Sequence, residues 1–488
     1  MLGLKAVPER VEAWINGRFQ QVSSGKYFEI HNPSSGEVLS SVACCQQAEI
    51  DLAVRSSREA LEKWRSLPSR SRGLMLRKMA EELESRCDEF ALVETLNCGK
   101  PLSEAKQDVI KSAESFAFYS ELSDKLFGKT IPISSGYHSY TIIEPRGVTA
   151  HISPWNYPLR LSVRSLAPAL ASGNSAVLKP SEYTPLTAIM LAQLFKECGL
   201  PDGLLNVVTG LGKEAGAFLA QHSGIQQISF TGSVPTGIEV ARIAASNIIP
   251  CTLELGGKSA NIVFADADLE AAVQGAKKAI FANSGQVCCA GSRLFVQSRM
   301  KDELLSKLAK EAKEMSIGAG LSNPQMGPLI SKEQHQKVLN YIELGKTEGA
   351  KLRAGGNALK GGKYENGYFV EATIFDEVKA EMRIAREEIF GPVLCTFEFE
   401  EEAEVLELAN ASEYGLVAGI WTKDLDRAHK LAAGLEVGQV YINDFFGGAV
   451  ANPFGGCKKS GFGRERGVEA FDNYTQVKSV CIKFHQDS

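Results

Sequence analysis

The pattern of apolar and polar positions changes its repeat along the chain. Between residues 47 and 122, apolar side chains recur at helical spacing, for example from Ile50 to Trp64. Positions three and four residues apart lie on one face of an α-helix. Pro68 and Pro101 interrupt the pattern, because proline cannot continue a helix. This segment is therefore predicted to form several separate helices.

From residue 147 to about 263, short β-rich runs alternate with helical patterns. The expected strands cover residues 148–152, 176–178, 205–208 and 227–230, and the expected helices cover 166–171, 186–198, 214–221 and 236–245. This alternation predicts a doubly wound parallel sheet, with ligands at the carboxyl ends of its strands. A second α/β series is expected between residues 266 and 435.

Two further segments are rich in strand-forming residues. Residues 12–31 contain short apolar runs around turn residues and are expected to form a hairpin region. Residues 137–143 combine β-branched and polar side chains, so we expect a hairpin that leaves its own domain and pairs elsewhere. The predicted fold class is α/β.

Composition and charge exclude several classes of protein. The chain has 488 residues, 44% hydrophobic and 23% charged, which is typical of a globular protein with two or three domains. The formal net charge of −5 argues against nucleic acid or an anionic membrane as a partner. No apolar run approaches the roughly 18 residues of a membrane helix, and no secretory signal is recognised at the start.

The cysteine content indicates a reducing compartment. There are 11 cysteines, an odd number without a repeating spacing, so we expect free thiols in the cytoplasm and no disulfide framework. No CxxC or HExxH motif occurs, and the seven histidines are dispersed. No metal site is therefore expected.

One stretch carries the strongest chemical signal. It begins with the sequence ELGGK at Glu254 and ends with GQVCC, whose cysteines are Cys288 and Cys289. A thiolate is a good nucleophile, and a carboxylate can act as base for the thiol or for a later water. Most cysteines, however, are small buried hydrophobic residues. The sequence alone does not say whether the carboxylate and the thiol meet.

Three other motifs follow predicted strands. FTGSVPTG, residues 230–237, could bind a pyrophosphate at a helix N-terminus or form a plain strand–helix turn. KPSE, residues 179–182, could hold ribose hydroxyls, where Glu182 would repel a 2′-phosphate and favour NAD over NADP; the alternative is a solvated loop. PWNYP, residues 154–158, contains Asn156, which could donate to an oxyanion or bond its own backbone. EIFGP from Glu388 and GFGRE ending at Glu465 each look like surface turns.

Taken together and in this order, the motifs resemble the NAD(P)-dependent aldehyde dehydrogenase superfamily. The set is completed by PFGG at residues 453–456 and SG at 460–461, and the resemblance covers residues 14 to 483. It is closest to the broad group that includes betaine aldehyde and aminoaldehyde dehydrogenases. The resemblance implies oxidation of an aldehyde to the acid with NAD, through a cysteine thiohemiacetal and thioester.

The resemblance also implies roles for individual residues. Cys288 is the nucleophile, Glu254 the base for the deacylating water, and Asn156 with the Cys288 N–H the oxyanion hole. Glu465 matches an acid that belongs to a proton relay in some members. The residues implied to bind the cofactor are Trp155, Lys179, Glu182, Gly232, Ser233, Glu388 and Phe390.

The implied substrate pocket departs from the pattern of that group. Tyr157 matches one wall of an aromatic box for a cationic substrate. Arg164 stands where a tryptophan is often found, and Phe445 stands at the C-terminal wall. A cation beside a cationic substrate is unfavourable, so these departures argue against betaine aldehyde. Arg164 could instead receive a carboxylate or polar tail, or point away and pair with an acid.

The resemblance further implies the domain organisation and assembly. A Rossmann-type NAD-binding domain is expected at residues 1–123 and 146–255, and an α/β catalytic domain at 256–440. A bridging β arm at residues 124–145 with 441–488 implies a homodimer or homotetramer. Three alternatives stay open: a betaine aldehyde or aminoaldehyde dehydrogenase specifically, a cysteine esterase or thioesterase on the same scaffold, and a binding protein that has lost activity. NADP is the less favoured cofactor.

Overall fold

The computed structural model describes residues 7–484. The helical segment after the first strands consists of α1 (Gln47–Ser66), α2 (Ser69–Ser85), α3 (Cys87–Cys98) and α4 (Leu102–Leu122). Pro68 and Pro101 directly precede α2 and α4, where a missing N–H breaks no helical bond. Gly99 ends α3 with a φ of 82°, a conformation that other residues rarely adopt. These helices confirm the predicted segment.

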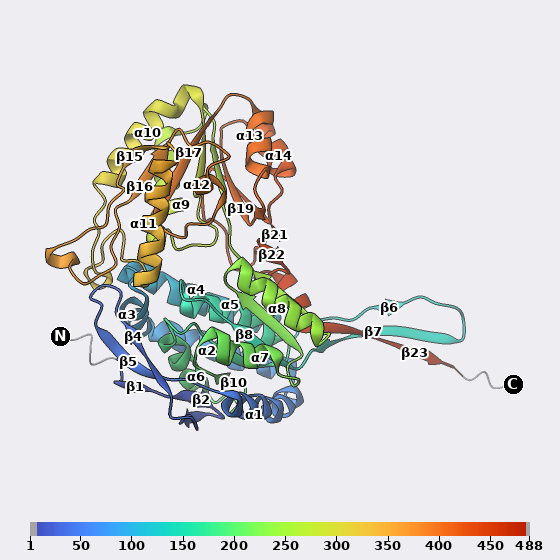
Figure 1. Ribbon diagram of the computed structural model, residues 1–488. Helices are drawn as coiled ribbons and strands as arrows, with labels where there is room; N and C mark the ends of the chain where they lie inside the picture. Colours follow the sequence, from blue (N-terminus) through green and yellow to red (C-terminus); the bar gives the residue numbers. More distant parts are fainter. Residues whose placement is uncertain (1–6, 485–488) are drawn as a thin grey trace.

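An eight-stranded sheet lies beside these helices (Figure 1), in the order β22-β12-β11-β8-β9-β10-β2-β3. Its strands are β2 (Ala13–Ile15), β3 (Arg18–Gln20), β8 (Val148–Ile152), β9 (Ser175–Lys179), β10 (Leu205–Val207), β11 (Gln227–Thr231), β12 (Cys251–Glu254) and β22 (Gly461–Phe462). The five strands from β12 to β10 are parallel, as predicted, and antiparallel strands close both edges. The connecting helices are α5 (Pro158–Ala171), α6 (Leu186–Glu197), α7 (Ala217–Gln221) and α8 (Val234–Ser246).

The expectation for residues 12–31 is only half right. β2 and β3 do pair as a hairpin. β4 (Tyr27–His31), however, belongs to a separate three-stranded sheet with β5 (Val38–Ala43) and β1 (Arg10–Val11). The turn at residues 32–37 causes this pairing, because the Asn32 N–H donates to the carbonyl of Glu37 and reverses the chain.

A second large sheet forms the other half of the molecule, with the order β15-β16-β17-β14-β13-β19-β20. Its strands are β13 (Ala260–Val263), β14 (Arg293–Gln297), β15 (Lys351–Ala354), β16 (Thr373–Asp376), β17 (Val393–Phe399), β19 (Val417–Trp421) and β20 (Gln439–Ile442). The helices of this half are α9 (Leu269–Phe281), α10 (Ser298–Lys313), α11 (Lys332–Thr347), α12 (Arg383–Arg386), α13 (Glu402–Asn410) and α14 (Leu425–Gly434). Two short strands, β18 (Tyr414–Gly415) and β21 (Cys457–Lys458), pair with each other.

A narrow three-stranded sheet projects from the body of the molecule (Figure 1). β7 (Tyr137–Pro145) pairs along its whole length with β23 (Thr475–Lys483), and β6 (Thr130–Ile131) adds a short third strand. The predicted hairpin at residues 137–143 thus pairs with the C-terminal strand. The boundaries proposed for the domains stay a prediction. In residues 7–484, no helix is long and apolar enough to cross a membrane.

Candidate active site

Glu254 and Cys288 border the same cavity. Glu254 is the last residue of β12, and Cys288 lies in the loop after a short 3₁₀ helix, η3 (Ala282–Gly285). This cavity measures about 210 Å³ and is also lined by Asn156 and Glu388. The structure therefore brings together the carboxylate and the thiol that the sequence separates by more than thirty residues.

A second cavity opens on the other side of the thiol. It measures about 440 Å³, and its lining includes Tyr157, Arg164 and Phe446. Cys288 lines both cavities, whereas Cys289 lines only the second. A reaction between two molecules, one in each cavity, would have to take place at Cys288.

The acidity of the two thiols is coupled. A hydrogen bond with Cys289 and burial raise the pKa of Cys288 well above its ordinary value, and the Arg164 guanidinium opposes this. The same hydrogen bond lowers the pKa of Cys289. The lower pKa favours Cys289 as the thiolate, but only Cys288 borders both cavities. A nucleophile must reach its substrate, so Cys288 is the better placed of the two.

The Glu254 carboxyl is buried without a hydrogen-bond partner. Neither of its oxygens accepts a hydrogen bond from residues 7–484, and its residue exposure is 2%. Burial and the Glu465 carboxylate raise the pKa of Glu254 well above its ordinary value, while Arg164 lowers it. Such a carboxyl holds its proton at a pH where ordinary carboxyls are ionised, so its basicity is matched to taking a proton from water.

Two N–H groups near Cys288 are available to an oxyanion. The Asn156 Nδ2 donates to the Gln286 carbonyl oxygen at 2.9 Å, which engages one of its two hydrogens. The backbone N–H of Cys288 makes no hydrogen bond within the described chain. Both donors belong to residues that line the smaller cavity, as an oxyanion hole requires.

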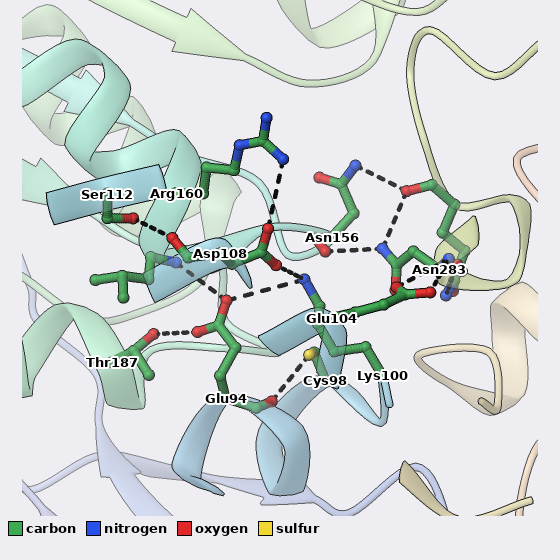
Figure 2. Close-up of polar contacts among 12 residues, drawn as sticks. Glu94, Cys98, Lys100, Glu104, Asp108, Ser112, Asn156, Arg160, Thr187 and Asn283 are labelled. Carbon is green, nitrogen blue, oxygen red and sulfur yellow. Dashed lines mark hydrogen bonds and ion pairs between the residues drawn. The ribbon is translucent and has the colours of Figure 1, made fainter. Parts of the chain in front are cut away.

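Figure 2 shows how Asn156 is held in place. Asn283 Nδ2 donates to the Asn156 carbonyl oxygen at 2.9 Å. The Asn283 N–H in turn donates to the Glu104 carboxylate at 3.1 Å. Asn283 and Ser284 have φ angles of 46° and 58°, so the loop before Cys288 is held in a left-handed conformation. Glu104 of α4 therefore fixes the loop that carries the thiol.

A buried ionic cluster lies next to this contact (Figure 2). Lys100 is fully buried, with its Nζ 2.5 Å from Asp108 and 4.0 Å from Glu94. Burial alone lowers the pKa of Lys100, but the two carboxylates reverse this and raise it. The ammonium also lies 4.0 Å from the centre of the Tyr157 ring. Sequence reasoning missed Lys100 and Glu104, because nothing in their local pattern shows that they are buried.

The expected adenosine-ribose residues form an ion pair at the end of β9. Lys179 Nζ lies 3.1 Å from Glu182 Oε2. Burial favours the neutral form of Glu182, but Lys179 and a backbone N–H from Gly212 hold its pKa below the ordinary value. A charged carboxylate and an ammonium at a strand end suit the hydroxyls of a ribose.

The expected pyrophosphate and nicotinamide residues also fit a dinucleotide. Ser233 is the exposed N-cap of α8, whose first turn, apart from Pro235, presents backbone N–H groups to an anion. Glu388 accepts a hydrogen bond from the Gly257 N–H at 3.0 Å and lines the smaller cavity. Phe390 packs edge-on against Trp155 at 5.2 Å. A Cβ at Gly256 would come within 2.4 Å of the Glu388 carboxylate, so a side chain there would displace Glu388.

The residues expected to form the substrate pocket do not all line the larger cavity. Arg164 forms an ion pair with Glu465 and lies over the Phe454 ring at 5.1 Å, yet it still lines the larger cavity. Phe445 was expected to form the C-terminal wall, but its exposure is 0% and it packs in the core. Phe446, with a φ of 69°, lines the cavity in its place. The left-handed turn at Phe446 directs the second aromatic side chain, not the first, to the cavity.

Comparisons with known proteins agree with this geometry. The model of the aldehyde dehydrogenase family matches residues 19–480. The chain belongs to the aldehyde dehydrogenase family. This aldehyde dehydrogenase is 44% identical over 473 residues to the putative aldehyde dehydrogenase DhaS of Bacillus subtilis (strain 168), covering 96% of this chain and 95% of the relative.

Solved structures resemble this aldehyde dehydrogenase over nearly its whole length. An NAD+ complex of an aldehyde dehydrogenase from Bacillus cereus has a TM-score of 0.96 and 44% identity, with 98% of this chain and 97% of that chain covered. An indole-3-acetaldehyde dehydrogenase with NAD+ has a TM-score of 0.96 and 41% identity, with 99% and 98% covered. The predicted α/β fold and enzyme class, an oxidoreductase acting on the aldehyde group, are confirmed.

Proposed function

We propose that this enzyme oxidises an aldehyde to the carboxylic acid with NAD, and that Cys288 is its nucleophile. The observation that carries the assignment is that Cys288 borders both cavities, whereas Cys289 borders one. The smaller cavity is the cofactor side, because Glu388 and Phe390 line it. The larger cavity is the aldehyde side.

The residues around Cys288 account for each step that the protein's own groups carry out. The Cys288 thiol releases its proton to solvent, its thiolate sulfur adds to the aldehyde carbon, and the carbonyl oxygen takes the negative charge between Asn156 Nδ2 and the Cys288 N–H. Bound NAD supplies the acceptor for the hydride that leaves this thiohemiacetal. Glu254 then takes a proton from water, which attacks the thioester carbon; the C–S bond breaks and the acid is released.

The choice of NAD over NADP rests on Glu182. Its carboxylate is ionised at neutral pH because its pKa is held below the ordinary value. A negative charge at the ribose position repels a 2′-phosphate and accepts hydrogen bonds from free hydroxyls. Lys179 partly offsets this charge, so we expect NAD to be preferred without NADP being excluded. Two similar solved structures are complexes with NAD+.

A quaternary-ammonium substrate fits this site poorly. The Tyr157 ring already has Lys100 Nζ at 4.0 Å and the Arg160 guanidinium at 5.7 Å from its centre. A third cation at that ring would meet repulsion from both. Betaine aldehyde and aminoaldehydes are therefore not the substrates we propose.

The test of the function is a panel of aldehydes with NAD, followed by the absorbance of NADH. We expect NADH and acid in equal amounts. Release of acid from an ester or thioester without any NADH from aldehydes would support a cysteine esterase and overturn the proposal. NADP in place of NAD measures the cofactor preference in the same assay.

We further propose that the enzyme works as a homo-oligomer in the cytoplasm. The arm of β6, β7 and β23 projects from the body, and Ile142, Val477 and Ile482 on it are exposed. A projecting sheet with apolar side chains is a surface for a second copy of the chain. The sedimentation coefficient of Val477→Asp, compared with that of the wild type, tests the assembly. An unchanged sedimentation coefficient argues against this arm.

The proposed location in the cytoplasm rests on the thiols. All 11 cysteines are free, which suits a reducing compartment.

A further inference from the structure

The larger cavity has an excess of positive charge. Its basic lining residues are Lys111, Arg160, Arg164, Lys278 and Arg466. Only two acidic side chains, Glu104 and Asp108, line the same cavity. An excess of guanidinium and ammonium groups around a cavity raises the local concentration of anions.

Most of these charges already have a partner. Arg164 pairs with Glu465, and Arg160 Nη1 lies 3.5 Å from Asp108. Asp108 is also held by Lys100 at 2.5 Å, so its charge is shared between two cations. Glu104 accepts a backbone N–H, and burial raises its pKa to about 7, so a fraction of it is neutral at physiological pH.

Two of the five, Lys278 and Arg466, make neither an ion pair nor a side-chain hydrogen bond within residues 7–484. Arg466 is the guanidinium of the two. Its guanidinium lies 5.1 Å from the centre of the Phe454 ring, and the Arg164 guanidinium lies 5.1 Å from the same ring centre. Burial and repulsion from Arg160 and Arg164 lower the pKa of Arg466 to about 10. An anion beside Arg466 would relieve this repulsion.

The backbone supports the same conclusion. Arg466 has a φ of 59° and Phe446 a φ of 69°, a region that side-chain-bearing residues adopt at a cost. Both side chains line the cavity. Strain at two lining residues indicates that the fold maintains this arrangement for the cavity and not for packing alone.

We propose that Arg466 binds a carboxylate of the substrate, so that the enzyme prefers aldehydes that carry a carboxylate at the end remote from the aldehyde. This inference rests on the proposed function, in which the larger cavity holds the aldehyde. A guanidinium binds a carboxylate through two parallel hydrogen bonds. Aromatic side chains such as Tyr441, Phe446 and Phe454 would cover the carbon chain between the two ends.

The test compares three aldehydes of similar length, namely succinic semialdehyde, butanal and γ-aminobutanal, with NAD. In the wild type, we expect kcat/KM to be highest for succinic semialdehyde and lowest for γ-aminobutanal. Arg466→Gln should lower the ratio of kcat/KM for succinic semialdehyde to that for butanal about 10- to 100-fold. Because both values come from one preparation, a loss of folded enzyme cancels in the ratio.

Two further variants make the result decisive. Arg466→Lys keeps the positive charge but cannot form two parallel hydrogen bonds, so its ratio should lie between those of the wild type and Arg466→Gln. If Arg466→Gln does not fold, Arg466→Lys still tests the proposal. Arg299→Gln, an exposed arginine on α10, is the control and should leave the ratio unchanged. An unaltered ratio in both Arg466 variants, or a wild-type preference for γ-aminobutanal, overturns the proposal. The absence of NADH from every aldehyde would instead refute the proposed function.

Discussion

The Arg164 guanidinium forms a buried ion pair with the Glu465 carboxylate, and residue exposures on both sides are 5% or less. The pair joins α5 to the loop that follows β22, and its acid also accepts a hydrogen bond from Ser229 Oγ at 3.3 Å. Arg164 thus has a protein counter-ion, which the sequence could only offer as one of two alternatives.

We expect Glu465→Gln to destabilise the protein. The substitution leaves the Arg164 charge buried without its partner, at a cost of about 3–5 kcal/mol in the free energy of unfolding. Glu469→Gln, an exposed neighbour, is the matched control and should change it by less than about 0.5 kcal/mol. Denaturant unfolding measures both. Equal stability of the two variants would mean that the ion pair contributes nothing.

Replacement of the two adjacent cysteines separates their roles. Cys288→Ala should abolish aldehyde-dependent NADH formation, because no other thiol borders both cavities. Cys289→Ala should retain much of the activity, because Cys288 is still present. The substitution removes the hydrogen bond between the two cysteines, which raises the pKa of Cys288, so this pKa should fall. Alkylation by iodoacetamide should therefore proceed at lower pH in Cys289→Ala than in the wild type. Normal turnover by Cys288→Ala would falsify the assignment.

The raised pKa of Glu254 predicts how deacylation depends on pH. Burial favours the protonated carboxyl, which cannot accept a proton from water. Hydrolysis of the acyl-enzyme should therefore be slow below this pKa and rise as the pH passes through it. Single-turnover measurements starting from acyl-enzyme isolate this step, because Cys288 is then esterified and no longer titrates.

Glu254→Gln should remove that rise and slow steady-state turnover by about 10²- to 10⁴-fold. A first burst of NADH should remain, because the thiol still adds to the aldehyde. If the burst disappears as well, Glu254 activates the thiol and not the water. A variant that keeps the pH dependence would point to another base.

Glu182 should control the choice between the two nicotinamide cofactors. In Glu182→Ala, the carboxylate that repels a 2′-phosphate is gone, while Lys179 remains as a phosphate partner. The ratio of kcat/KM for NAD to that for NADP should fall by roughly tenfold or more. A ratio that stays constant would show that other residues determine the preference.

Much of the architecture was accessible from the sequence, for identifiable reasons. The strands β8, β9 and β10 are almost wholly buried, and each appears in the sequence as a short β-rich run between helical patterns. The motifs at strand ends meet because parallel strands present their carboxyl ends on one side. Glu254 reaches the cavity on this basis, whereas Cys288 reaches it from the loop after η3.

Other features depend on long-range contacts or backbone angles that no local pattern reveals. Lys100 reads as an ordinary charged residue after a helix, and only the fold surrounds it with Asp108 and Glu94. Phe445 and Phe446 are adjacent and chemically identical. Only the fold shows that Phe446, with a φ of 69°, lines the larger cavity while Phe445 packs in the core.

The pairing of β22 with β12 has a consequence for when the active site is completed during synthesis on the ribosome. Glu254 sits beside Gly461, and Glu465 and Arg466 follow a few residues later. These groups are synthesised long after Arg164, Glu254 and Cys288. Until they are made, a nascent chain lacks the edge strand β22, cannot neutralise Arg164 and cannot complete the cavity around Cys288. Catalytic competence therefore waits for the segment after residue 460, and an earlier nascent chain carries its thiol without the full active site.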